Sequence, residues 1–171
     1  MSTQHTGPLR LKEAWLTLAE LAAVCEVPEK DAENWQGRRI LDLGERFPNG
    51  RRFYSVLDAL KLATMHGLTR RVPIGPTNAA RAARVMAEYV LANTPRDDAG
   101  RALADFGSIP HTQALALAVI NGEWRVDEVA LGLGYANHAG RWGRAHIVVP
   151  IASLAADIIF RLFQQTPETA Q

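Results

Sequence analysis

Five arginines lie between Gln36 and Tyr54, where only two acidic residues accompany them. Guanidinium groups bind phosphate oxygens through paired hydrogen bonds and keep their charge at physiological pH. The chain of 171 residues has a formal net charge of only +1, so any affinity for nucleic acid must come from such a local cluster. A solvated charged face is the alternative interpretation of the same run. The arginines are Arg38, Arg39, Arg46, Arg51 and Arg52.

Polar residues that could contact bases come directly before this cluster. Lys30, Asn34 and Gln36 lie in a short segment for which we expect a helix, and asparagine or glutamine can pair with adenine. The same segment also carries Glu29, Asp31 and Glu33, whose acidic side chains would repel phosphates. We therefore expect the arginine-rich segment to supply most of the affinity. Tyr54 could either pack in the core or donate its hydroxyl to a phosphate.

Two short helices are predicted before the arginines. Thr17 and Glu20 have the spacing of a capping box, which predicts a helix that stops near Glu26. Pro28 disfavours helical geometry at the residue before it and suits the first position of a second helix, about 28–36. That helix should bury Ala32 and Trp35. Gly37 is the expected left-handed residue at its end.

A basic hairpin and a third helix are predicted next. Residues 40–43 form the expected first strand, residues 51–54 the second, and Pro48-Asn49-Gly50 the turn. Ser55 and Asp58 then have the spacing of a second capping pair. A winged helix-turn-helix consists of two helices with a turn between them, a basic hairpin and a further helix, and this is the predicted order. Its second helix can enter the major groove.

These residues carry a resemblance. The stretch from Ala14 to Arg71 resembles the winged helix-turn-helix DNA-binding domain of MerR-like regulators and of related phage repressors and excisionases. The matching features are the capped helix from Thr17, Trp35 followed by Arg38, the pair Ile40-Leu41, and the Arg51-Arg52-Phe53-Tyr54-Ser55 element. The resemblance implies double-stranded DNA as partner, with Thr17 added to the polar and basic candidates above. The acidic second helix departs from the family pattern.

The second half predicts a small α+β module. An alanine-rich helix over 78–93 could pack on its own domain or form a dimer seam, and residues 94–110 suit a linker. Asn121-Gly122 between alternating runs predicts a hairpin of 114–120 with 123–129. The module is completed by an irregular loop at 130–144, a strand at 145–149 and an amphipathic helix from Pro150. A disordered tail is expected after Gln165.

The predicted fold is therefore α+β and mostly helical. Residues 14–93 are expected to form the winged helix-turn-helix domain with its trailing helix. Residues 111–165 are expected to form a hairpin, strand and helix that dimerise or bind a signal or partner. The long leucine-rich coiled coil of ordinary MerR-like regulators is not predicted, so their dimer geometry and their metal and drug sensing are not transferred.

Enzymatic and metal-binding classes are disfavoured. The histidines lack metal-ligand spacing, the serines lack nucleophile motifs, and the lone Cys25 precludes an intramolecular disulfide or a cysteine-rich zinc site. We expect no cofactor and no catalytic site. No signal peptide or membrane-spanning run is predicted, which makes the cytoplasm the expected compartment.

The sequence thus favours a sequence-specific transcriptional regulator of phage or mobile-element type that binds DNA as a homodimer. RNA polymerase or another regulator is a further candidate partner. One alternative is an architectural or packaging protein, similar to an excisionase or a small terminase. Another is a protein-interaction module whose arginines meet acidic partners and which does not bind DNA.

Overall fold

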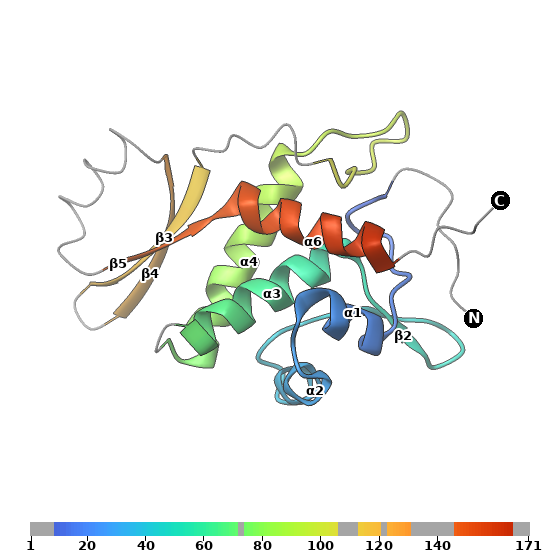
Figure 1. The fold of residues 1–171 in the computed structure, drawn as a ribbon, viewed down its shortest axis with the longest axis horizontal. Helices are drawn as coiled ribbons and strands as arrows, with labels where there is room; N and C mark the ends of the chain where they lie inside the picture. Colours follow the sequence, from blue (N-terminus) through green and yellow to red (C-terminus); the bar gives the residue numbers. More distant parts are fainter. Residues whose placement is uncertain (1–8, 72–73, 106–112, 121–122, 131–145, 166–171) are drawn as a thin grey trace.

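The computed structural model describes residues 9–71, 74–105, 113–120, 123–130 and 146–165. These residues form a mixed α+β fold with five helices, one two-stranded antiparallel sheet and one three-stranded antiparallel sheet. In Figure 1 the three-stranded sheet lies at the left end, and α2 lies at the bottom. The elements in chain order are α1 (Leu18–Cys25), α2 (Glu29–Gly37), β1 (Glu45–Arg46), β2 (Arg52–Phe53), α3 (Val56–Arg71), α4 (Pro76–Asn93), β3 (Gln113–Ile120), β4 (Glu123–Ala130), β5 (His146–Pro150) and α6 (Ile151–Gln165).

Helix α1 begins with the predicted capping box. The backbone N–H of Glu20 donates to Thr17 Oγ1 at 3.3 Å, and the backbone N–H of Thr17 donates to Glu20 Oε2 at 2.8 Å. The helix ends at Glu26, whose φ of 53° is left-handed and turns the chain toward α2. Both predicted ends of this helix are confirmed.

Helix α2 ends at Gly37, one residue later than the sequence suggested. The left-handed residue is Arg39, with a φ of 55°, whereas Gly37 is still helical, so that prediction was wrong. The Arg39 N–H donates to Gln36 O, and the Ile40 N–H donates to Trp35 O, each at 2.9 Å. This is the hydrogen-bond pattern of a Schellman motif. It lets Ile40 and Trp35, both half-buried, pack against the core.

The predicted hairpin forms, but its first strand was misplaced. Strand β1 begins at Glu45 and pairs with β2, so the expected strand at 40–43 is wrong. Leu41 and Leu43 are instead buried in an irregular connection that fills the core beneath the hairpin. The predicted turn is present, with Gly50 at a φ of 79°.

Helices α3 and α4 form the centre of the fold. The Ser55 N–H donates to Asp58 Oδ2 at 3.0 Å and the Asp58 N–H to Ser55 Oγ at 3.3 Å, which confirms the second capping pair. Helix α4 starts at Pro76, two residues before the expected start, and packs closely on α3. The small side chains that allow this approach are buried within the chain: Ala79, Ala80, Ala82, Ala83 and Ala87.

The predicted second hairpin is also confirmed. Strands β3 and β4 pair in antiparallel register from Gln113↔Ala130 to Ile120↔Glu123, and β5 pairs antiparallel with the other edge of β3. Helix α6 follows β5 directly and crosses back over α1 and α3 (Figure 1). Arg161 on α6 donates to the Val24 carbonyl at 3.2 Å.

The division into domains at 14–93 and 111–165 stays a prediction, and two observations weigh against it. One apolar cluster contains buried residues from both parts, including Leu60 and Met86 as well as Leu117 and Ile158. The described part of the expected linker, 94–105, is hydrogen-bonded to the start of the chain. No helix among the described residues is long and apolar enough to cross a bilayer.

Candidate nucleic-acid interface

Helix α2 presents one polar face to solvent, made of two neighbouring stripes. Lys30, Asn34 and Arg38 recur every four residues and are all exposed. Glu29 and Glu33 form the acidic stripe beside them and are also exposed. The third acid, Asp31, is ion-paired with Arg70 of α3 at 2.7 Å. That pair attaches α2 to α3 and offsets one of the three negative charges.

The end of α2 is attached to the β1–β2 hairpin through a single carbonyl group. The Leu43 carbonyl oxygen accepts a hydrogen bond from Gln36 Nε2 at 2.7 Å and another from Arg52 Nη1 at 2.7 Å. The Tyr54 hydroxyl donates to Gln36 Oε1 at 3.2 Å. A helix residue and two hairpin residues therefore meet at one point. This shared contact fixes the hairpin relative to α2.

Four of the five predicted arginines leave their guanidinium groups available to a ligand. Arg38, Arg39, Arg46 and Arg51 are exposed, and their side chains make no hydrogen bond or ion pair to any other described residue. Two of them follow the last turns of α2 and two belong to the hairpin. Because the elements are joined at Leu43, the four charges come from neighbouring parts of the structure.

The remaining predicted site residues have intramolecular partners. Gln36 and Arg52 bind the Leu43 carbonyl, so they position the hairpin. Thr17 is exposed, but its hydroxyl donates to Glu20 at 2.9 Å in the capping box. Tyr54 is only 3% exposed, which supports the core alternative over a phosphate contact. Burial raises the pKa of its hydroxyl, and the hydrogen bond to Gln36 partly offsets that shift.

Two contacts at this site escaped the sequence analysis. Phe47, at the hairpin tip, is 37% exposed and meets the Phe53 ring edge-on, with centroids 5.2 Å apart. Arg84 of α4 donates to the Ile40 carbonyl at 3.0 Å and supports the chain between α2 and β1. Phe47 and Phe53 lie on either side of the predicted Pro48-Asn49-Gly50 turn, and this placement could have indicated the first contact. No local pattern indicates the second, because the partners lie 44 residues apart.

The exposed arginine and lysine side chains of this surface are suited to binding a polyanion. The charged groups exposed there are the arginines and Lys30, with Glu29 and Glu33 in the acidic stripe beside them. Among the described residues there is no group of three or more His, Cys, Asp or Glu side chains that could hold a metal ion.

Comparison with protein-family models gives no match for this chain, and neither does comparison with curated proteins.

Proposed function

We propose that this protein binds double-stranded DNA through α2 and the β1–β2 hairpin, which together act as a winged helix-turn-helix. The observation that carries the proposal is the set of four exposed arginine side chains without described protein partners, on two elements that share the Leu43 contact. A protein that neutralises DNA phosphates gains affinity as counterions are released. Arginines that are already engaged within the protein would contribute less.

The contacts within the protein indicate which residues would bind phosphates and which would contact bases. Arg46 and Arg51 on the hairpin and Arg38 and Arg39 after α2 bind phosphates, which sets the position of the protein on the duplex. Lys30 and Asn34 lie in the same stripe as Arg38 and are the candidates for contacts with base edges. Gln36 does not read a base in this scheme, because both ends of its amide are bonded within the protein.

A transcriptional regulator of phage or mobile-element type, acting as a homodimer on a two-fold site, is the biological role that we propose. An excisionase-like or packaging role uses the same surface and differs in which genomic sites are occupied. Sedimentation with and without a duplex tests the dimer, and mapping of bound sites in the native host separates promoters from attachment or packaging sites.

A protein-interaction role is the second candidate, and the acidic stripe of α2 favours it. Glu29 and Glu33 are exposed, and no ion pair joins them to another described residue. Against a duplex they would oppose binding, whereas against a basic protein surface they would assist it. Replacing both with glutamine separates the two roles, because DNA affinity should then rise and affinity for a basic partner should fall.

The direct test of DNA binding is fluorescence anisotropy with a labelled duplex in about 50 mM salt, where phosphate contacts contribute strongly. Arg51→Gln should weaken binding about tenfold, the expected scale for losing a charged hydrogen bond. Arg81→Gln is the matched control, because Arg81 is an exposed arginine of α4 and belongs neither to α2 nor to the hairpin. Equal affinities of the two variants, or no binding by the wild-type chain, would contradict the proposal.

A further inference from the structure

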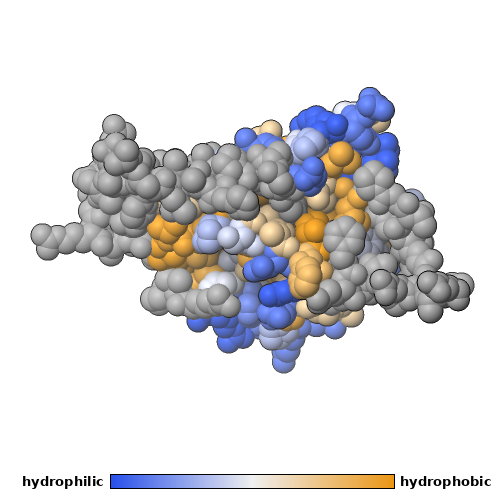
Figure 2. All heavy atoms as spheres, turned by 45° about the horizontal axis from the view of Figure 1, so that its top comes forward, coloured by the Kyte–Doolittle hydropathy of each residue, from blue (hydrophilic) through white to orange (hydrophobic). Residues whose placement is uncertain are grey.

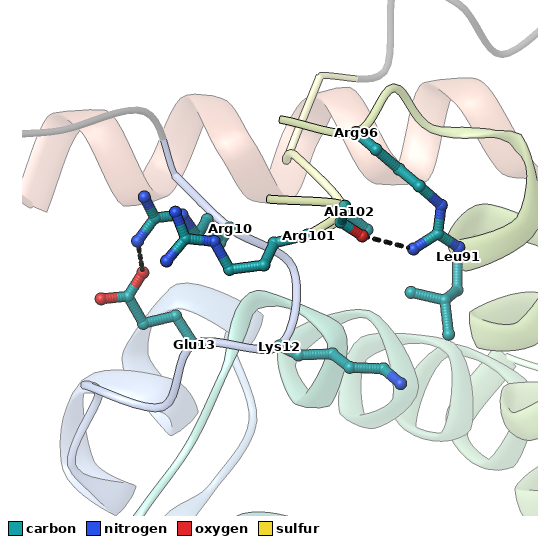
Figure 3. Close-up of a pocket in the computed structure, with 8 residues that line it drawn as sticks. Arg10, Lys12, Glu13, Leu91, Arg96, Arg101 and Ala102 are labelled. Atoms are coloured by element: carbon teal, nitrogen blue, oxygen red, sulfur yellow. Dashed lines mark hydrogen bonds and ion pairs between the residues drawn. The ribbon is translucent and has the colours of Figure 1, made fainter. Parts of the chain in front are cut away.

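A separate pocket of about 510 Å³ lies between the start of the chain and the loop that follows α4. Three groups of residues line it (Figure 3): Arg10, Lys12 and Glu13; Leu91 near the end of α4; and Arg96, Gly100, Arg101 and Ala102. Backbone hydrogen bonds hold the walls together: Leu11 N–H donates to the Ala102 carbonyl at 2.9 Å and Ala104 N–H to the Leu9 carbonyl at 2.7 Å. Figure 2 shows hydrophilic atoms gathered at the upper right of the molecule, where Figure 1 places this loop.

Part of the charge around the pocket is internally compensated. Arg10 donates to Asp97 at 3.2 Å and is ion-paired with Glu13 at 3.2 Å, while Arg101 donates to the same Asp97 carboxylate at 2.8 Å. The backbone N–H groups of Ala99 and Arg101 also donate to Asp97. These hydrogen bonds lower the pKa of Asp97 and keep its carboxylate ionised. The largest contribution comes from the backbone N–H of Arg101. Two arginines thus face two carboxylates.

Two further cations have no such compensation. Lys12 is exposed, and its ammonium has no hydrogen-bond or ion-pair partner among the described residues. Arg96 donates to the Gly100 carbonyl at 2.8 Å, which fixes its guanidinium but leaves its charge without a counter-charge. In Figure 3 both side chains extend toward Leu91. The pocket therefore combines an excess of two positive charges with an apolar wall.

We propose that this pocket binds a small organic phosphate, with the phosphate between Lys12 and Arg96 and the organic part against Leu91. A phosphate monoester carries the matching charge of about −1.5 to −2 at pH 7. Arginine provides the planar, paired donors that recognise phosphate oxygens, and lysine provides a point charge. The volume lies within the 300–1,000 Å³ that is typical of small-molecule sites. Leu91 gives the organic group an apolar surface.

This site is distinct from the proposed DNA surface. None of its lining residues lies between Gln36 and Tyr54, and the proposal does not depend on DNA binding. Ligand binding is therefore measured on the full chain without DNA, and a duplex is added only as a competitor.

The experiment is isothermal titration calorimetry with phenyl phosphate as the organic probe and inorganic phosphate as the probe without an apolar part. Phenyl phosphate should bind with one site per chain and several times more tightly than inorganic phosphate. Lys12→Gln and Arg96→Gln should each weaken it about tenfold, the scale for losing one charged hydrogen bond. Arg81→Gln should leave binding unchanged, because it removes the same charge about ten helical positions, or roughly 15 Å, from Leu91 along α4.

Three outcomes would overturn the proposal. One is the absence of phenyl phosphate binding, and another is equal binding by the wild type and both pocket variants. In the third, a duplex competes with phenyl phosphate for the wild-type chain, and this competition weakens in parallel in Lys12→Gln and Arg96→Gln. That result would make the pocket a contact for DNA phosphates. Lys12→Gln keeps the test sound if Arg96→Gln misfolds, because the Lys12 side chain has no partner among the described residues.

Discussion

Replacing Gly44 with alanine should damage this fold more than the same change at any other glycine that the structure describes. Gly44 joins the buried Leu43 to strand β1 and has a φ of 70°. A Cβ built there would lie 2.7 Å from two ring carbons of Tyr54 and 2.8 Å from the Phe53 carbonyl oxygen. Real Cβ atoms essentially never make such contacts, so the ring or the hairpin backbone must move.

The expected cost has two parts. A left-handed alanine costs roughly 1–2 kcal/mol. Overpacking a close-packed site adds about 1–3 kcal/mol, and Tyr54 cannot move away easily because it is buried and its hydroxyl is bonded to Gln36. The sum is roughly 2–5 kcal/mol in the free energy of unfolding.

Two other glycines serve as matched controls in urea unfolding followed by tryptophan fluorescence. Gly50 has a φ of 79° and nothing within 4 Å of the added Cβ, so Gly50→Ala should cost only the roughly 1–2 kcal/mol of backbone strain. Gly37 is the last helical residue of α2 and has the same open space, so Gly37→Ala should gain about 0.4–1 kcal/mol by lowering the entropy of the unfolded chain. Equal losses for Gly44→Ala and Gly50→Ala would refute the proposed clash with Tyr54.

Three further predictions follow from burial and capping. Burial raises the pKa of the Cys25 thiol to about 12, so iodoacetamide should modify this thiol at the rate of unfolding. The free energy of unfolding should fall as pH rises from 9 to 12, because the thiol of the unfolded chain ionises first. Thr17→Ala should cost about 1 kcal/mol in urea unfolding, because the capping box of α1 is lost. A chain that ends at Thr94 should be molten by near-ultraviolet circular dichroism, because it lacks Leu117 and Ile158 of the shared core.

Local features were predictable from the sequence because their causes are local. The capping pairs at Thr17 and Ser55 form within three residues, and each produced the predicted helix start. The β3–β4 hairpin follows from Asn121-Gly122 between two alternating runs, and its register is set by that short connection.

What the sequence could not provide depends on contacts between distant residues. The sequence pattern of Leu41 and Leu43 is typical of a strand. In the structure the chain turns at the left-handed Arg39, and both leucines are buried in the core without forming a strand. Helix α6 contacts α1 through the hydrogen bond from Arg161 to the Val24 carbonyl. These residues are 137 positions apart, so no local sequence pattern indicates the contact. The two-domain prediction relied on a polar linker composition and could not anticipate that packing.

The candidate site shows the same limit. Residue type identified the five arginines, and the structure leaves four of their side chains at the surface without a partner among the described residues. Type alone also made Gln36 a candidate for a base contact and left Tyr54 between core packing and a phosphate contact. Their hydrogen bond joins residues 18 apart in the sequence, and it gives them a positioning role.

The salt dependence of duplex binding tests the central claim most directly. Anisotropy titrations from about 50 to 200 mM salt should give a linear plot of log affinity against log salt, with a slope near −0.9 per neutralised phosphate. A variant in which Arg38, Arg39, Arg46 and Arg51 are all glutamine should lose about 3–4 from the magnitude of that slope, whereas Arg81→Gln should keep the wild-type value. An unchanged slope in the fourfold variant, with its fold intact by circular dichroism, would show that these arginines do not face DNA.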